Sequence, residues 1–163
     1  MLIEDKNEYK AVWNKVYEKL KFAPSCSYRG HSMDANLPFQ IEGEYAVYGI
    51  ENMTGAQIDL LQTFMKEAFV SITQEQDRMY ALDWQHSAFL FNPREEEKDE
   101  KHFFPSFYPD GDYYFFIDRF FKFGYLGHPW RQEVWIFGDK LLAAVDGIYH
   151  KLGWEKIRWN TII

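Results

Sequence analysis

Apolar residues recur every three or four positions in three stretches of the chain, a pattern that predicts amphipathic helices. The first helix is expected over residues 5–22. The second begins at a capping box, in which the side chains of Thr54 and Gln57 each bond the other residue's backbone amide. The third opens at Gly138 and is expected to stop near Gly153, because glycine commonly ends helices.

The other apolar stretches are short, rich in β-branched and aromatic residues, and bounded by turn signals, which predicts strands. More than a third of residues 108–137 are Phe, Tyr or Trp. Most links between successive strands are too short for a helical crossover, so the sheet is expected to be mainly antiparallel. The strands are expected at residues 39–50, 79–84, 88–91, 113–117, 120–126, 132–137 and 156–159.

Together these elements predict an α+β fold. The expected arrangement is a single two-layer domain over residues 1–163, with a mainly antiparallel sheet covered by about three helices. A charged run, REEEKDEK, occupies residues 94–101 and interrupts the pattern. Such runs are usually solvated surface, so a mobile acidic loop is predicted at about 93–107.

The aromatic content changes this picture, because 20% of the residues are Phe, Tyr or Trp. Each aromatic side chain can bury about 150–250 Å², so this number would overfill a small core. Some aromatic residues are therefore expected at the surface or in a cleft. The surplus, chiefly Trp130, Tyr125 and Tyr113 or Tyr114, indicates where a ligand would be sought.

The net charge of −7 argues against nucleic-acid binding, which depends on neutralising phosphates with Lys and Arg. An acidic balance suits a soluble protein or one that meets a basic partner. The single cysteine, Cys26, excludes an internal disulfide and a cysteine-rich zinc site. No secretory signal pattern and no apolar run of membrane-spanning length occurs, so a cytoplasmic protein without a membrane partner is expected, as a monomer or weak dimer.

The first candidate for chemistry is Asp83-Trp84-Gln85-His86, where a carboxylate could orient a histidine as a general base. In a strand, Asp83 and His86 would point to opposite faces unless the chain turns between them. The favoured alternative is a polar turn in which Asp83 binds backbone amides.

Asp110-Gly111-Asp112 is the second candidate, followed by Tyr114. Two acids could bind a hard cation, but the further ligands of a calcium loop are missing. A turn leading into a strand is the favoured interpretation.

The third candidate is the corner Gly127-His128-Pro129-Trp130, with Arg131 after it. His128 follows a predicted strand, where binding groups often lie on a rigid scaffold. Trp130 and Arg131 are residue types that dominate interface energetics. The alternative, equally weighted, is a structural turn in which a backbone carbonyl satisfies His128.

No metal and no cofactor are predicted. The five histidines are scattered, without a spaced pair or paired cysteines. A site assembled in space from Asp83, His86 and His128 would need support that the sequence lacks. Phosphate-binding glycine loops, nucleophile elbows and dinucleotide fingerprints are also absent.

Three segments, Met79–His86, Tyr108–Phe116 and Phe123–Phe137, resemble the signature blocks of a bacterial family, the domain-of-unknown-function family numbered 2716. The N-terminal helix fits as well, so the resemblance spans nearly the whole chain. The acidic insert at 94–101 departs from it. The resemblance implies a single-domain cytoplasmic protein and no assigned activity or catalytic residues.

Two hypotheses of function remain open, and whether the protein is an enzyme stays undecided. The favoured one is a binding protein, of an immunity or antitoxin-like kind, which presents an aromatic sheet face or its rim to a protein or small-molecule ligand. The alternative is a small enzyme or ligand-binding domain with a pocket built from Asp83, His86, Asp112 and His128. The candidate binding residues are Asp83, Trp84, His86, Asp112, Tyr114, His128, Trp130 and Arg131.

Overall fold

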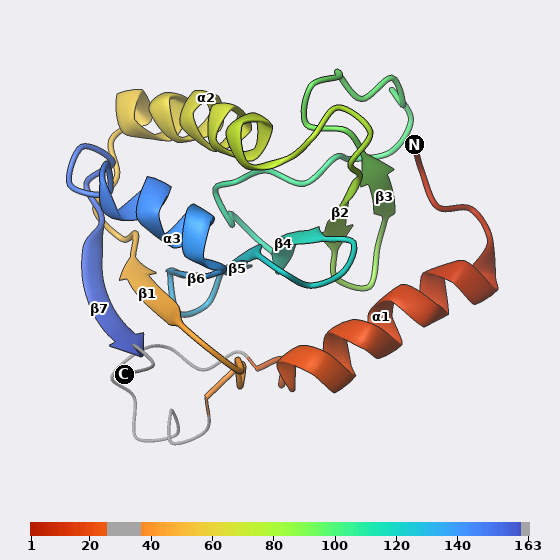
Figure 1. Cartoon of the computed structure of the whole chain (residues 1–163), viewed down its shortest axis with the longest axis horizontal. Coiled ribbons are helices and arrows are strands. Elements are labelled where there is room, and N and C mark those ends of the chain that lie inside the picture. The colour runs from red at the N-terminus through yellow and green to blue at the C-terminus, as the bar shows by residue number, and fades with distance from the viewer. Residues whose placement is uncertain (26–36, 161–163) are drawn as a thin grey trace.

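A computed structural model describes residues 1–25 and 37–160 (Figure 1). Cys26 therefore lies outside the described residues, as does the stretch around Gly30 that the sequence predicts to be irregular. The three helices are α1 (Lys6–Leu20), α2 (Gly55–Ile72) and α3 (Asp139–Asp146). The strands are β1 (Tyr45–Gly49), β2 (Met79–Asp83), β3 (Ala88–Phe91), β4 (Tyr114–Asp118), β5 (Gly124–His128), β6 (Glu133–Phe137) and β7 (Glu155–Asn160).

All seven strands form one sheet in the order β3-β2-β4-β5-β6-β1-β7. Every neighbouring pair is antiparallel. The predicted α+β class, the antiparallel sheet and the three helices are thus confirmed.

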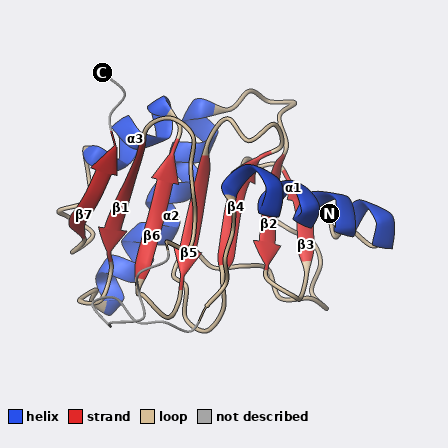
Figure 2. Ribbon diagram, turned by 90° about the horizontal axis from the view of Figure 1, so that it is seen from below, coloured by secondary structure: helices blue, strands red, loops and turns tan. Residues whose placement is uncertain are grey.

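The helices lie on both faces of the sheet rather than in one layer. Helix α1 covers one face, and α2 and α3 cover the other (Figure 2). Adjacent residues of a strand point to opposite faces, so Phe115 packs in the α1 core and Phe116 in the α2/α3 core. A sheet buried on both faces carries apolar side chains on both sides of its strands. This explains the continuous aromatic runs.

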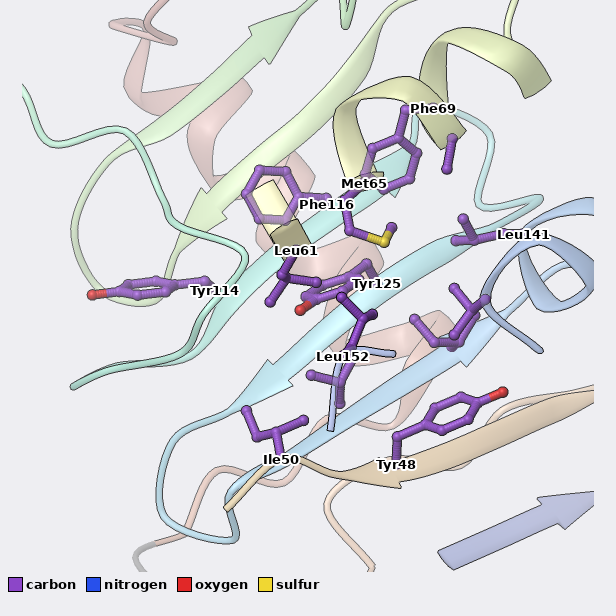
Figure 3. Packing of buried hydrophobic residues seen from close by; sticks show 14 of the residues in the cluster. Tyr48, Ile50, Leu61, Met65, Phe69, Tyr114, Phe116, Tyr125, Leu141 and Leu152 are labelled. Atoms are coloured by element: carbon purple, nitrogen blue, oxygen red, sulfur yellow. The ribbon is translucent and has the colours of Figure 1, made fainter. Parts of the chain in front are cut away.

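The apolar side of α2 packs against the sheet. Leu61, Met65 and Phe69, all from one face of α2, point toward Phe116 and Tyr125 of the sheet (Figure 3). Spacings of four residues place these three side chains on one side of the helix. The capping box at Thr54 fixes where the helix begins.

Most of the aromatic side chains are buried in two separate cores, one on each face of the sheet. Tyr113 and Tyr125 are fully buried and Tyr114 nearly so, which corrects the expectation that they remain for a ligand. Trp130 does stay 38% exposed, and Phe120 is 72% exposed.

Several element boundaries differ from the sequence prediction. Strand β1 covers only Tyr45–Gly49 of the strand expected over 39–50. Strand β5 begins at Gly124, because residues 119–123 form the turn that follows β4. The Asp118 carboxylate accepts the backbone N–H groups of Phe120 and Lys122, and Phe121 adopts a left-handed φ of 58°. Helix α3 ends at Asp146 and gives way to turns, well before Gly153.

The charged segment after β3 contains neither helix nor strand. The start of this segment is held at the C-terminal end of α2 by Arg94. The Arg94 guanidinium donates to the carbonyl oxygens of Val70 and Gln74, each at 2.9 Å. In the part of the chain that is described, no helix is both long and apolar enough to cross a membrane.

Candidate functional site

Three segments meet at one end of the sheet. Strands β2 and β5 end there, at Asp83 and His128, while β4 and β6 begin there, at Tyr114 and Glu133. Antiparallel neighbours run in opposite directions, so the end of one strand lies beside the start of the next. We call the connecting segments at this end, residues 83–87, 108–113 and 128–133, the rim.

The β2–β3 turn brings the first pair of candidate residues together. Gln85 has a left-handed φ of 64°, and the N–H of His86 donates to the carbonyl of Asp83 at 2.9 Å. The chain therefore reverses between Asp83 and His86, and both side chains reach the same side. His86 Nδ1 lies 3.1 Å from Asp83 Oδ1.

Asp112 completes a cluster of three. Its Oδ2 lies 3.2 Å from His86 Nδ1, while its Oδ1 accepts the N–H of Tyr113 at 2.8 Å. The backbone bond fixes the carboxylate with one oxygen directed at the imidazole. The cluster, Asp83, His86 and Asp112, combines a buried acid, an exposed histidine and a partly exposed acid.

The environment shifts the pKa values of this cluster. Burial raises the pKa of the Asp83 carboxyl, and the hydrogen bond from His86 works in the opposite direction. That hydrogen bond, together with the charge of Asp83, raises the pKa of His86. The imidazole side chain is 63% exposed, so its ring is accessible from solvent.

Trp84 connects the rim to helix α1. Its indole Nε1–H donates to the Tyr17 hydroxyl at 2.9 Å, and its backbone N–H donates to the carbonyl of Tyr113 at 3.1 Å. The Trp84 and Tyr113 rings also meet edge to face, with centroids 5.4 Å apart. These contacts hold the β2–β3 turn against residues 112–113.

His128 occupies a different, buried environment. Its Nδ1 accepts the N–H of Arg131 at 3.2 Å, so in the neutral ring Nε2 carries the proton and faces the Tyr113 hydroxyl at 3.3 Å. That hydroxyl also accepts the N–H of Ser25 at 2.7 Å and donates to the Ser25 carbonyl. Burial first, and then the charge of Arg131, lower the pKa of His128 to about 3.

Arg131 is likewise buried and forms an ion pair with Glu133. Arg131 Nε lies 2.9 Å from Glu133 Oε2, and that oxygen also accepts the indole N–H of Trp135 at 3.2 Å. A buried guanidinium needs such a partner, because an unpaired buried charge is costly. Neighbouring Trp130 remains partly exposed.

A glycine allows residues 108–113 to lie close to the sheet. A Cβ atom at Gly127 would lie 3.0 Å from Pro109 Cβ and 3.1 Å from the Tyr114 carbonyl oxygen. The Tyr108 hydroxyl also donates to Gln132 Oε1 at 3.4 Å. These contacts tie the middle rim segment to the β5–β6 turn.

The larger hollows described by the structure lie away from the rim. Two, of about 780 and 420 Å³, flank exposed Phe120 at the opposite end of the sheet. A third, of about 1020 Å³, lies beside the charged segment after β3.

The structure thus divides the candidate residues into groups. Asp83, His86 and Asp112 come together, with Trp84 beside them; Trp130 is at the surface, and His128 and Arg131 are in the buried network. Tyr114 packs in the α2/α3 core against Phe103, and burial followed by the charge of Asp110 raises its pKa to about 12. Sequence reasoning missed Tyr17 and Ser25 as partners, since no motif marks either residue.

Fold and rim together define a class: an α+β domain with a two-sided antiparallel sheet and an Asp-His-Asp cluster at one end. A family model described as protein of unknown function (DUF2716) matches residues 4–142, and the chain belongs to that family, which confirms the resemblance noted in its sequence blocks. A similar protein is the uncharacterized protein YxiI of Bacillus subtilis (strain 168). It is 35% identical over 140 residues, which cover 83% of this chain and 85% of YxiI. No solved structure matches the chain.

Proposed function

We propose that the protein is a binding protein that presents its rim to a basic protein partner. The observation that carries this proposal is the convergence of carboxylates and aromatic side chains from three distant segments at one end of the sheet. Function commonly lies on such connecting segments, which a rigid sheet holds in place.

The charges of the rim favour a basic partner. Asp110 is exposed and Asp112 partly exposed, while Asp83 is buried in the same cluster as Asp112. Arg131 does not offset these acids, because Glu133 pairs with it. Complementary charge of this kind speeds encounter and selects partners, and the net charge of −7 acts in the same direction.

The aromatic residues of the rim supply contact area. Trp130 is 38% exposed, and Trp84 is partly exposed beside His86. Tryptophan is over-represented among the residues that dominate interface energies, because it buries a large surface with little loss of conformational freedom. The rim therefore combines tryptophan side chains that contribute binding affinity with carboxylates that favour a basic partner.

The finer role that we propose is that of an immunity or antitoxin-like protein, monomeric or weakly dimeric in the cytoplasm. A small acidic domain of this type would neutralise a basic toxin by covering its functional surface. This role is an analogy in size and charge, and it rests on the binding proposal.

A capture experiment with paired charge variants tests the proposal. Immobilised wild type is compared with Asp110→Asn/Asp112→Asn in the rim and with Glu42→Gln/Glu44→Gln at the opposite end. Each variant loses two negative charges. We expect wild type and the Glu42/Glu44 variant to retain the same basic protein from lysate at low salt, and the rim variant to lose it. No basic protein at either low or high salt, or equal loss in both variants, would overturn the proposal.

The alternative is an enzyme or ligand-binding domain in which His86 acts as a base. It is favoured by one observation, the orientation of the exposed His86 ring by two carboxylates. The predicted pocket that includes His128 has less support, because His128 is fully buried and both of its ring nitrogens are hydrogen-bonded within the protein. An NMR screen of small-molecule fragments tests it: shifts confined to residues 83–86 and 110–113 would support it, and a screen without such shifts would count against it.

A further inference from the structure

Asp83, His86 and Asp112 present three potential ligand atoms to one point in space. The atoms all lie within 4.8 Å of one another. Asp83 ends strand β2, His86 lies in the next turn, and Asp112 comes from the segment that leads into β4. The pairing of β2 with β4 brings these parts of the chain together.

The spacing fits the coordination shell of a small divalent cation. His86 Nδ1 lies 3.1 Å from Asp83 Oδ1 and 3.2 Å from Asp112 Oδ2. Zinc bonds of about 2.0–2.1 Å to nitrogen and oxygen, arranged as a tetrahedron, place neighbouring ligand atoms about 3.3 Å apart. The two contacts to the imidazole therefore match two edges of such a tetrahedron, and the third edge, between the carboxylate oxygens of Asp83 and Asp112, lies within 4.8 Å.

The hydrogen bonds within the cluster also show where a cation could replace a proton. Ionised carboxylates only accept hydrogen bonds, so the shared contacts require a proton on His86 Nδ1. A metal ion would take the place of this proton and be bound by the same three atoms.

Asp83 gives an independent reason to expect a cation. The Asp83 side chain is only 8% exposed. Its charge partner among the described residues is His86, whose side chain is 63% exposed and therefore lies largely in solvent. A buried carboxylate needs a compensating charge held close to it. Backbone bonds already position the ligands: Asp83 donates its N–H to Ser87, and Asp112 accepts the N–H of Tyr113.

We propose that Asp83, His86 and Asp112 form a binding site for one divalent cation of the zinc class, with water completing the coordination. An imidazole nitrogen with two carboxylate oxygens is a ligand set that suits zinc and its neighbours better than calcium, which takes six to eight oxygens. The site goes beyond the proposed partner binding and does not depend on it.

The test is calorimetric titration of the full chain, without an affinity tag, with zinc ions, supported by the visible absorption of the cobalt(II) form. We expect one equivalent to bind with a dissociation constant below about 100 μM. His86→Gln and Asp112→Asn should each weaken binding at least about tenfold, since each removes a ligand. Both residues are at least partly exposed, so these variants are expected to fold, and their thermal unfolding is measured alongside.

The chain supplies a matched control. His102 and Asp99 form a similar pair, with Nδ1 and Oδ2 3.0 Å apart, but among the described residues no second carboxylate joins them to make a group of three. His102→Gln should therefore bind zinc like the wild type. Absence of one-equivalent binding, or binding that His86→Gln and Asp112→Asn leave unchanged, would overturn the site. Because His86→Gln keeps every rim carboxylate, partner capture by this variant separates failure of the metal site from failure of the proposed function.

Discussion

His86 and His128 lie at the same end of the sheet, yet their surroundings give them opposite properties. Exposed His86 lies beside two carboxylates, which favour its charged form. Buried His128 lies near Arg131, and its unprotonated Nδ1 accepts a backbone N–H. The sequence places each histidine next to a turn but cannot distinguish them, because the difference arises from contacts between segments far apart in the chain.

His128 makes the stability of the protein depend on pH. Its folded-state pKa of about 3 lies below the ordinary value of 6.5, so below pH 6.5 the unfolded chain binds a proton that the folded protein excludes. The free energy of unfolding should therefore fall as the pH drops from 6.5 toward 3, by about 1.4 kcal/mol per pH unit from this group.

His128→Gln removes that contribution, because glutamine does not titrate. Urea unfolding between pH 6.5 and 4 should give a flatter stability profile for this variant than for wild type, whatever its absolute stability. His102→Gln, at an exposed position, is the control. Parallel profiles for wild type and His128→Gln would contradict the buried neutral histidine.

At the scale of elements, the helical period and the capping residues predict α1 and the start of α2 well. The sequence predicts a strand for the aromatic run at Phe120–Phe123, but the run forms a turn, because the Asp118 carboxylate accepts the backbone N–H groups of Phe120 and Lys122. An aspartate before the run is a turn signal that outweighs the β-propensity of phenylalanine. The end of α3 was missed because its apolar period continues through the turns beyond Gly147.

The two-sided burial of β4 yields a paired prediction. Phe115 and Phe116 are adjacent and fully buried, one under α1 and the other under α2. Phe115→Ala and Phe116→Ala should each lower the free energy of unfolding by about 3–5 kcal/mol, because each leaves a cavity. Denaturant unfolding measures both, with the milder leucine variants as substitutes if an alanine variant fails to fold. A near-zero effect at either position would contradict a core on that face.

The close approach of Pro109 to β5 can be tested at Gly127. The added methyl group of Gly127→Ala would press on Pro109 and on the Tyr114 backbone. We expect a loss of about 1–3 kcal/mol in unfolding free energy, with NMR shifts spreading to Asp112. Gly55→Ala is the control, since nothing lies within 4 Å of its Cβ position. Equal effects of the two substitutions would contradict the packing of residues 108–113 against the sheet.

At the scale of the whole molecule, the antiparallel α+β class follows from short links between strands, and the structure confirms it. The division of the helices between two faces could not be predicted, because periodicity shows that a helix has an apolar face but not which side of the sheet it covers. That division explains why so many aromatic residues are buried. The rim is also a property of the whole molecule, since strand order alone brings Asp112 beside Asp83.

Hydrogen–deuterium exchange of the protein alone and bound to its captured basic partner tests the rim most directly. Exchange is expected to slow on binding in residues 83–87, 108–113 and 128–133, and to stay unchanged at the opposite end around Phe120. Slowed exchange around Phe120 with an unchanged rim would contradict the account.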